Sequence, residues 1–309
     1  MRIARELCGA ALLILGAGAM LATQAAPATQ VLKVAGAELE FGFAAEDFRD
    51  GAEPLLDWAR RAVTIVGDYY SQFPVPSLTL EVRAVAGSGV HGGRTEGGRR
   101  PEIRVQLGRE VTAAELMRDW VLVHEMAHLA LPEVGEEHAW LSEGLATYVE
   151  GIARTQAGNM SAAELWQEYL GSMPKGMPLA GDAGLDHTHT WARTYWGGAL
   201  WCLLADVTIR ERTHNRVGLQ DALRAVVRDS GGLRNSWPIE RVFAVGDRAT
   251  GTTVLTELYM QMRDHPAPPD LPALWRRLGI DEVDGAMRLA TGTSAAAVRE
   301  AITRAPLRS

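Results

Sequence analysis

Cysteine is nearly absent from this 309-residue chain, which has only Cys8 and Cys202. A disulfide-stapled scaffold is therefore excluded, because such scaffolds need several pairs of cysteines. No apolar run reaches the roughly 18 residues of a membrane-spanning helix, which excludes an integral protein with several spans. Basic residues are also outnumbered, since 31 Lys and Arg stand against 38 Asp and Glu and give a net charge of -7. Such a balance opposes a phosphate-binding surface, and we expect no nucleic-acid partner.

The beginning of the chain has the pattern of a secretory signal peptide. Arg2 and Arg5 form a short basic start, and an uncharged run over residues 9–21 follows. Small residues then offer cleavage after Ala25 or after Ala28, and the pattern does not choose between them. An uncleaved N-terminal anchor is the alternative. We expect a secreted or periplasmic protein whose mature chain has no transmembrane segment.

The secondary-structure pattern changes near residue 108. Before it, residues 78–83 and 103–107 alternate apolar and polar side chains as half-buried strands do, and residues 54–70 have the apolar spacing of a helix. After it, helical patterns and short loops dominate. We therefore expect an α+β protein in three parts, which are a signal peptide (1–25), a small strand-bearing N-terminal lobe (26–110) and a mostly helical lobe (111–309).

A glycine-rich segment, residues 87–98, connects the two predicted strands. It is poor in apolar residues, so we expect a mobile loop in which His91 is solvated. The strand from Glu102 to Leu107 is then expected to be an exposed sheet edge that can hold an extended peptide by strand addition.

The helical part opens with the signature of a capping box. The side chain of Thr112 can cap a helix, and the side chain of Glu115, three residues later, can accept the backbone N–H of Thr112. We expect this helix to run from Ala113 until Pro132 stops it.

Residues 124–128 of this predicted helix read His-Glu-Met-Ala-His, which is the HExxH spacing. Two imidazoles four residues apart project from one helical face and can bind a single Zn²⁺. Glu125, about 100° around the helix, can reach a water at the metal. The neighbouring residues are apolar, so the three polar side chains need a compensating partner in the core. A pair of histidines satisfied by hydrogen bonds alone is the alternative.

A catalytic zinc takes three protein ligands and keeps one position open for water, so a third ligand is expected downstream. Val134 stands where a metzincin has its third histidine, six residues after His128, which excludes that class. A second helix is expected to begin near Trp140, with Glu143 in its first turn, and Glu143 is the candidate ligand. His138 is the competitor, although its place in an acidic turn favours a solvated loop.

The segments His124–His128 and Trp140–Tyr148 together spell HExxH followed by W-x-x-E-G-x-A-x-Y, which resembles the gluzincin metallopeptidases of the aminopeptidase N and glycyl aminopeptidase families. Tyr195 and Gly198 resemble the Y-x-x-G helix of the same families. The resemblance implies a zincin-like fold with the zinc cleft between the two lobes. It also implies one Zn²⁺ per chain, held by His124, His128 and Glu143, with Glu125 as the catalytic base and Tyr195 assisting the transition state.

Tyr195 has a second interpretation, because Trp191, Trp196 and Trp201 make its surroundings aromatic, as in a core. The Y-x-x-G context favours the interpretation in which Tyr195 assists the transition state. In the following helix we expect Cys202 to be a small buried apolar residue, and Asp206 to form a structural pair with Arg210 four residues later.

These features predict a secreted zinc metallopeptidase that hydrolyses bonds of a peptide or protein substrate. No G-x-M-E-N sequence precedes the HExxH helix, so aminopeptidase and endopeptidase activity both stay open. An inactive peptidase-like module that binds a partner in the cell envelope is the alternative from another class. No feature of the sequence specifies an oligomeric state.

Overall fold

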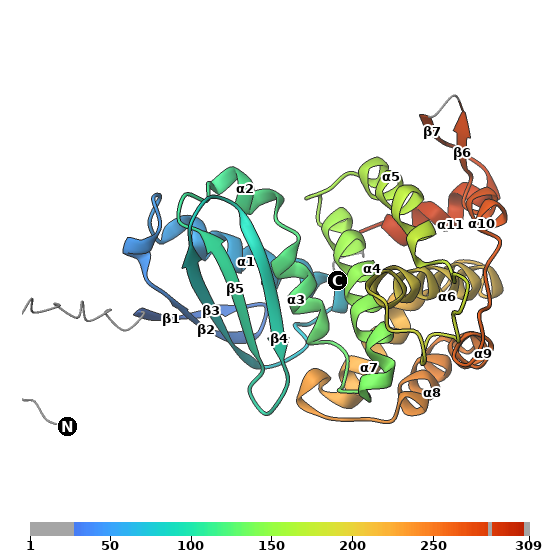
Figure 1. The fold of residues 1–309 in the computed structure, drawn as a ribbon, viewed down its shortest axis with the longest axis horizontal. Helices are drawn as coiled ribbons and strands as arrows, with labels where there is room; N and C mark the ends of the chain where they lie inside the picture. The colour runs from blue at the N-terminus through green and yellow to red at the C-terminus, as the bar shows by residue number, and fades with distance from the viewer. Residues whose placement is uncertain (1–27, 284–285, 306–309) are drawn as a thin grey trace, which may run out of the picture.

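The computed structural model describes residues 28–283 and 286–305 (Figure 1), so the expected signal peptide lies outside the described residues. A five-stranded sheet forms the N-terminal part, in the order β1-β2-β3-β5-β4. Its strands are β1 (Ala28–Val34), β2 (Ala37–Phe43), β3 (Ser77–Val85), β4 (Val90–Glu96) and β5 (Glu102–Gly108). The strands β2, β3 and β5 are mutually parallel, while β1 and β4 pair antiparallel at the two ends of the sheet. Helix α1 (Glu53–Tyr70) connects β2 to β3, as a parallel pair requires.

Strand β4 corrects the expectation of a mobile loop over residues 87–98. Residues 90–96 of this segment pair with β5, and Gly87 and Gly89 adopt the positive φ of the turn before the strand. Its side chains are exposed or half-buried, so no alternation of core residues marks it as a strand. The expectation for Glu102–Leu107 was also wrong, because β5 lies between β3 and β4. The edge strand on this side of the sheet is β4.

Helices dominate the rest of the described chain, which confirms the expected α+β class. They are α2 (Ala113–Arg118), α3 (Val121–His128), α4 (Ala139–Gln156), α5 (Ala162–Ser172), α6 (Gly198–Arg212), α7 (Leu219–Ser230), α8 (Ile239–Thr250), α9 (Val254–Met262), α10 (Leu271–Arg277) and α11 (Ser294–Thr303). A small hairpin of β6 (Ile280–Val283) and β7 (Ala286–Leu289) precedes α11. Helix α3 contacts β4, β5 and α1 on one side and α4 on the other, so it lies where the sheet meets the helices (Figure 1). One hydrophobic core extends through both parts.

The helix expected from Ala113 to Pro132 is broken in the structure. The capping box of Thr112 and Glu115 forms as predicted, but α2 ends at Arg118 and α3 begins at Val121. Asp119 causes the break, because its extended backbone lets its carboxylate accept the N–H groups of Val121 and Leu122 and the indole N–H of Trp58. A side chain that caps a new helix competes in this way with continuation of the old one.

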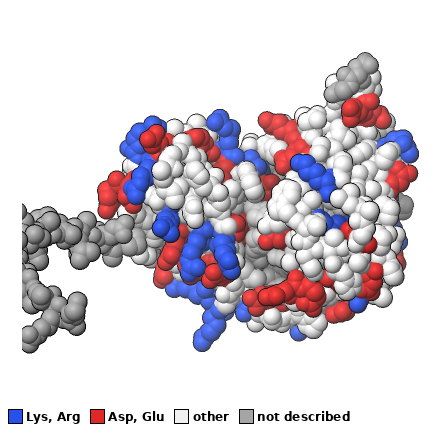
Figure 2. Space-filling view, viewed as in Figure 1, with Lys and Arg blue, Asp and Glu red and all other residues white. Residues whose placement is uncertain are grey.

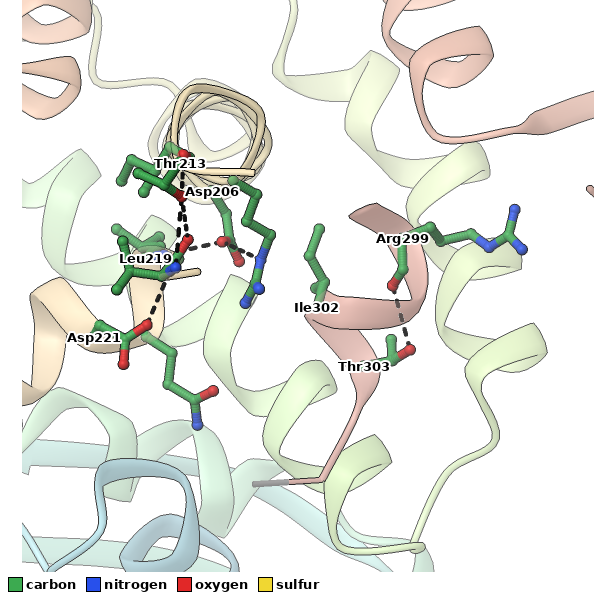
Figure 3. A network of polar contacts seen from close by, with 12 residues as sticks. Asp206, Thr213, Leu219, Asp221, Arg299, Ile302 and Thr303 are labelled. Atoms are coloured by element: carbon green, nitrogen blue, oxygen red, sulfur yellow. Dashed lines mark hydrogen bonds and ion pairs between the residues drawn. The ribbon is translucent and has the colours of Figure 1, made fainter. Parts of the chain in front are cut away.

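The pair of Asp206 and Arg210 is structural, as predicted. Asp206 accepts hydrogen bonds from Arg210 Nε at 2.8 Å and from the backbone N–H of Leu219, which lies beside it in Figure 3. It also accepts a hydrogen bond from the hydroxyl of Tyr148. It thereby ties α6 to α7 and α4 in the helical part. Cys202, one turn earlier on α6, is fully buried, and its burial raises the pKa of its thiol. This agrees with the small apolar residue expected there.

The surface carries charge of both signs. On the face in Figure 2, basic side chains gather over the strand-bearing part, and acidic ones gather on the border of the helical part that adjoins it. Over the residues that the structure describes, none of the helices has the length and apolar character needed to cross a membrane.

Candidate metal centre and cleft

Two consecutive helices bring three metal-ligating side chains together. His124 and His128 lie one turn apart on α3, and Glu143 lies in the second turn of α4. One carboxylate oxygen of Glu143, Oε2, is 3.4 Å from His124 Nε2 and 3.5 Å from His128 Nε2. Within the described ranges, this is the group of His, Cys, Asp and Glu side chains close enough to hold a metal ion. The structure thus brings together the three residues that the sequence singled out as ligands.

The geometry of this group fits a zinc ion. Nitrogen and oxygen ligands about 2.0–2.1 Å from a tetrahedral zinc lie about 3.3–3.4 Å from one another, close to the separations between the Glu143 oxygen and the two imidazoles. The hydroxyl of Ser142 lies 3.0 Å from His128 Nδ1. A hydrogen bond there orients the ring and leaves Nε2 free for a metal. Two imidazole nitrogens and one carboxylate oxygen are also ordinary zinc donors.

Electrostatics keep the Glu143 carboxylate ionised. Its partial burial raises its pKa, but the hydrogen bonds and electrostatic interactions with His124 and His128 lower it more, so the net pKa is well below the usual range. An ionised carboxylate is the form that binds a metal.

Glu125 lies beside this group and is held by β4. Its side chain is 7% exposed, and its Oε2 accepts a hydrogen bond from the hydroxyl of Thr95 at 2.7 Å. A Cβ added at Gly93 would lie only 2.5 Å from Glu125 Cγ, so the strand can approach this closely because residue 93 has no side chain. Alternate residues of β4 therefore fix the carboxylate from the sheet side.

Tyr195 faces the metal group from another helix. It lies in a π-helical turn, η4 (Arg193–Gly197), that leads into α6, and such turns are frequent at functional sites. Its ring stacks on that of His124, with centroids 6.2 Å apart and an interplanar angle of 10°. Burial and the carboxylates of Glu143 and Glu125 raise the pKa of Tyr195 to about 12. The hydroxyl therefore stays protonated and able to donate a hydrogen bond.

Glycines explain how α4 and α6 come close enough for this arrangement. A Cβ added at Gly144 would collide with the backbone of Gly198, and one added at Gly198 would collide with the carbonyl oxygen of Trp140. The two helices therefore cross backbone to backbone at these positions. Glu143 directly precedes one glycine and Tyr195 lies three residues before the other, so the crossing brings the carboxylate and the phenol to the same place.

Three other histidines, His91, His138 and His187, do not join the group. His138 is not solvated, because its Nδ1 pairs with the buried Asp186 at 2.9 Å and its ring packs against Tyr259. Asp186 also accepts a hydrogen bond from the indole N–H of Trp140. His138 therefore belongs to a buried polar cluster around Asp186, and the expectation that it lies in a solvated loop was wrong. His187 is exposed and pairs with Asp264, and His91 is exposed on β4.

A cleft of about 700 Å³ opens beside the metal group. Its walls come from β4 and from α3, the start of α4 and Tyr195, with Glu133 and Leu233 beside Gly97, the residue after β4. Thr95 was not predicted from the sequence, because it lies in the segment expected to be a loop. The alternation of Gly93 and Thr95 is the signal that would have found it, once that segment is taken as a strand above Glu125.

The comparisons with known proteins agree with this fold. No family model matches the chain, and no curated protein matches it in sequence. Among solved structures, the chain is similar to the aminopeptidase N family protein from Idiomarina loihiensis, with a TM-score of 0.59 and 13% identity, over 82% of this chain and 49% of that one. An M1 zinc metallopeptidase from Deinococcus radiodurans follows at a TM-score of 0.48 and 14% identity, over 78% and 52% of the two chains. The chain spans about half the length of these proteins, and it has the gluzincin-like fold of the aminopeptidase N family protein.

Proposed function

We propose that this chain is a zinc metallopeptidase that hydrolyses peptide bonds. The observation that carries the proposal is the convergence of His124, His128 and Glu143 beside the buried carboxylate of Glu125, with a Glu143 oxygen at zinc-ligand separations from both imidazoles. Three ligands leave a fourth position for water, which is the composition of a catalytic rather than a structural zinc site. We propose one zinc per chain.

The side chains divide the chemistry among them. When bound, the zinc supplies Lewis-acid polarisation of a water molecule and of the scissile carbonyl. Glu125 accepts a proton from the water as the oxygen attacks the carbonyl carbon, and passes that proton to the leaving amine when the C–N bond breaks. Tyr195 donates its hydroxyl hydrogen to the oxygen on which negative charge develops. Thr95 holds the Glu125 carboxylate in place during both proton transfers.

The free edge of β4 is the proposed path of the substrate backbone. An extended peptide can pair with an unpartnered edge strand through main-chain hydrogen bonds. Since β4 forms one wall of the cleft, a peptide paired with it lies between the strand and the metal group. Aminopeptidase and endopeptidase cleavage are both compatible with this path.

We also propose that the protein is exported, with residues 1–25 or 1–28 removed as a signal peptide, and that residues 26–110 and 111–309 are its two lobes. Export is supported by the basic start and uncharged run of the sequence. N-terminal sequencing of protein from the producing cells tests it. An intact Met1 on protein recovered from the soluble cytoplasm would contradict it.

The proposal is tested first on the metal. Glu143→Ala removes one of three ligands, so zinc affinity should fall strongly, while Glu136→Ala, which removes an equal charge from the exposed turn before α4, should leave it unchanged. Metal content and zinc titration of the purified variants measure this. Stoichiometric zinc at wild-type affinity in Glu143→Ala would remove Glu143 from the ligand set.

The second test separates metal binding from chemistry. Glu125→Gln keeps the shape of the side chain, but an amide cannot accept the proton of the water. Zinc content should stay near wild type while turnover of a mixed peptide library, followed by mass spectrometry, falls at least about 100-fold. Undiminished cleavage by zinc-loaded Glu125→Gln would refute the role of Glu125.

A further inference from the structure

A row of aromatic rings extends from the metal group to the protein surface. The ring of Trp120 packs edge-on against His124, with centroids 5.7 Å apart. The ring of Tyr195 stacks on the same imidazole, and Trp191 stacks on Tyr195 with centroids 5.7 Å apart. Each of the two tryptophans therefore contacts one residue of the proposed site, Trp120 a metal ligand and Trp191 the proposed oxyanion donor.

Each tryptophan lies one helical turn before a residue of the proposed site. Trp120 precedes His124 by four residues, so it lies one turn upstream on the same face of the α3 helix. Trp191 likewise precedes Tyr195 by four residues at the start of the helix that leads into α6. The break at Asp119 gives Trp120 its place at the N-terminal end of α3. Two separate helices thus each present a tryptophan beside the same site.

The exposure of these two side chains sets them apart. The chain has nine tryptophans, and all lie in the part that the structure describes. Seven are buried, whereas Trp120 is 51% exposed and Trp191 is 62% exposed. Large apolar rings in contact with water lack the favourable free energy that burial of apolar surface supplies. A bound partner that covers these rings would gain that free energy.

The lining of the cleft itself has a different character. It includes the charged side chains of Arg94, Glu96 and Glu133, which suit polar or charged groups of a substrate. Trp120 and Trp191 are not among the lining residues, so the exposed aromatic surface lies just outside the cleft, where the two rings pack against His124 and Tyr195. A side chain of a peptide bound across the metal would reach it within one or two residues of the scissile bond, because each extended residue spans about 3.3 Å.

We propose that Trp120 and Trp191 form a subsite for a bulky apolar or aromatic side chain of the peptide, next to the bond that is cleaved. This inference rests on the proposed function, because the occupant is a peptide only if the protein is a peptidase. The expected substrates are then peptides that have a residue such as Phe, Trp or Leu near the scissile bond. Tyr195 and His124 form its inner wall, so occupancy also positions the peptide at the reacting groups.

The test uses zinc-loaded Glu125→Gln, which should bind peptides without cutting them. Its affinity is measured by calorimetry for an alanine-based hexapeptide and for the six peptides in which Phe replaces one alanine in turn. At one position Phe should tighten binding at least about tenfold. Adding Trp120→Ala or Trp191→Ala to Glu125→Gln should remove most of that gain and leave the affinity for the parent peptide nearly unchanged. The control is Met260→Ala, which truncates an exposed apolar residue of α9 and should preserve the gain.

Trp120→Phe and Trp191→Phe keep an aromatic ring and should retain part of the gain, and zinc content and thermal unfolding of every variant establish that it is folded. Equal affinity for all seven peptides would overturn the subsite, and so would a Phe preference that survives both alanine substitutions. The wild-type enzyme is then given the preferred peptide. If the peptide binds with the tryptophan-dependent preference but is never cleaved, the subsite stands and the peptidase proposal fails.

Discussion

At the scale of single residues, Thr95 is the partner that orients Glu125. Its hydroxyl donates to the carboxylate at 2.7 Å from a neighbouring strand. Thr95→Val removes this hydrogen bond at nearly constant volume. We expect kcat to fall about tenfold or more, since hydrogen bonds to charged groups are worth ~1.5–3 kcal/mol, while KM and zinc content change little.

Thr95→Ser is the matched control, because it retains the hydroxyl and loses only a methyl group. It should recover most of kcat in steady-state assays on the same peptide. A loss of kcat that is equal in both variants and follows their melting temperatures would mean that Thr95 supports only the fold of β4.

Tyr195 provides a second prediction at this scale. If its hydroxyl donates to the developing oxyanion, Tyr195→Phe should lower kcat and kcat/KM together by about 10²–10³, with KM nearly constant. Phenylalanine keeps the ring that stacks on His124, so the melting temperature should change little. Unchanged kcat in the zinc-loaded variant would exclude the hydroxyl from the reaction and leave Tyr195 as a packing residue.

At the scale of secondary-structure elements, the sequence predicted what short-range spacing determines. His124 and His128 share one helical face, and Glu143 follows in the next helix, so two local motifs were enough to name all three residues. The strand β4 was missed because its pairing with β5 comes from backbone hydrogen bonds, and its glycines and polar side chains carry no core pattern. Thr95 was lost with it.

The break before α3 was missed for a related reason. The local sequence does not show whether Asp119 continues one helix or caps a new one, because the outcome depends on the contact of its carboxylate with Trp58, which is distant in the sequence. The expected edge role of Glu102–Leu107 failed because the alternation of a half-buried strand is the same in the middle and at the end of a sheet.

The close crossing of α4 and α6 gives a prediction at the element scale. Gly198→Ala places a methyl group against the carbonyl oxygen of Trp140, so the helices must separate. We expect a loss of about 1–3 kcal/mol of stability from overpacking, together with a fall in kcat, because Glu143 and Tyr195 move apart.

Gly171→Ala is the control, since this glycine of α5 has open space around it and alanine is the better helix former by about 1 kcal/mol. Urea unfolding should show destabilisation for Gly198→Ala and unchanged or increased stability for Gly171→Ala. If Gly198→Ala were as stable and as active as wild type, close backbone contact would not be what holds these helices.

At the scale of the whole molecule, a buried carboxylate should make stability depend on pH. Glu150 of α4 pairs with Arg154 at 3.2 Å and also faces Glu168 of α5 and Asp119 before α3. Burial, opposed by Arg154 and assisted by the other carboxylates, raises the pKa of Glu150 to about 8. Between the ordinary value of 4.5 and about 8 the folded chain holds a proton that the unfolded chain has released. The free energy of unfolding should therefore fall as pH rises through this window.

Glu150→Gln cannot ionise, so its free energy of unfolding should fall less steeply over the same window. Urea unfolding of both proteins at pH 5 and pH 8, with saturating zinc, measures the two slopes. Identical slopes would mean that Arg154 keeps Glu150 charged throughout.

The three proposed zinc ligands lie close together in the sequence, and this affects the order in which parts of the protein fold. His124 and Glu143 are 19 residues apart, whereas Thr95 comes from a strand 30 residues before Glu125 and Tyr195 from beyond α5. Closing a short loop costs less entropy, and local contacts form sooner. We expect the α3–α4 pair to assemble early, so that zinc captured at that stage clips the two helices together. A folding chain would then hold its metal before β4 and α6 have docked, and would acquire its zinc earlier than its activity.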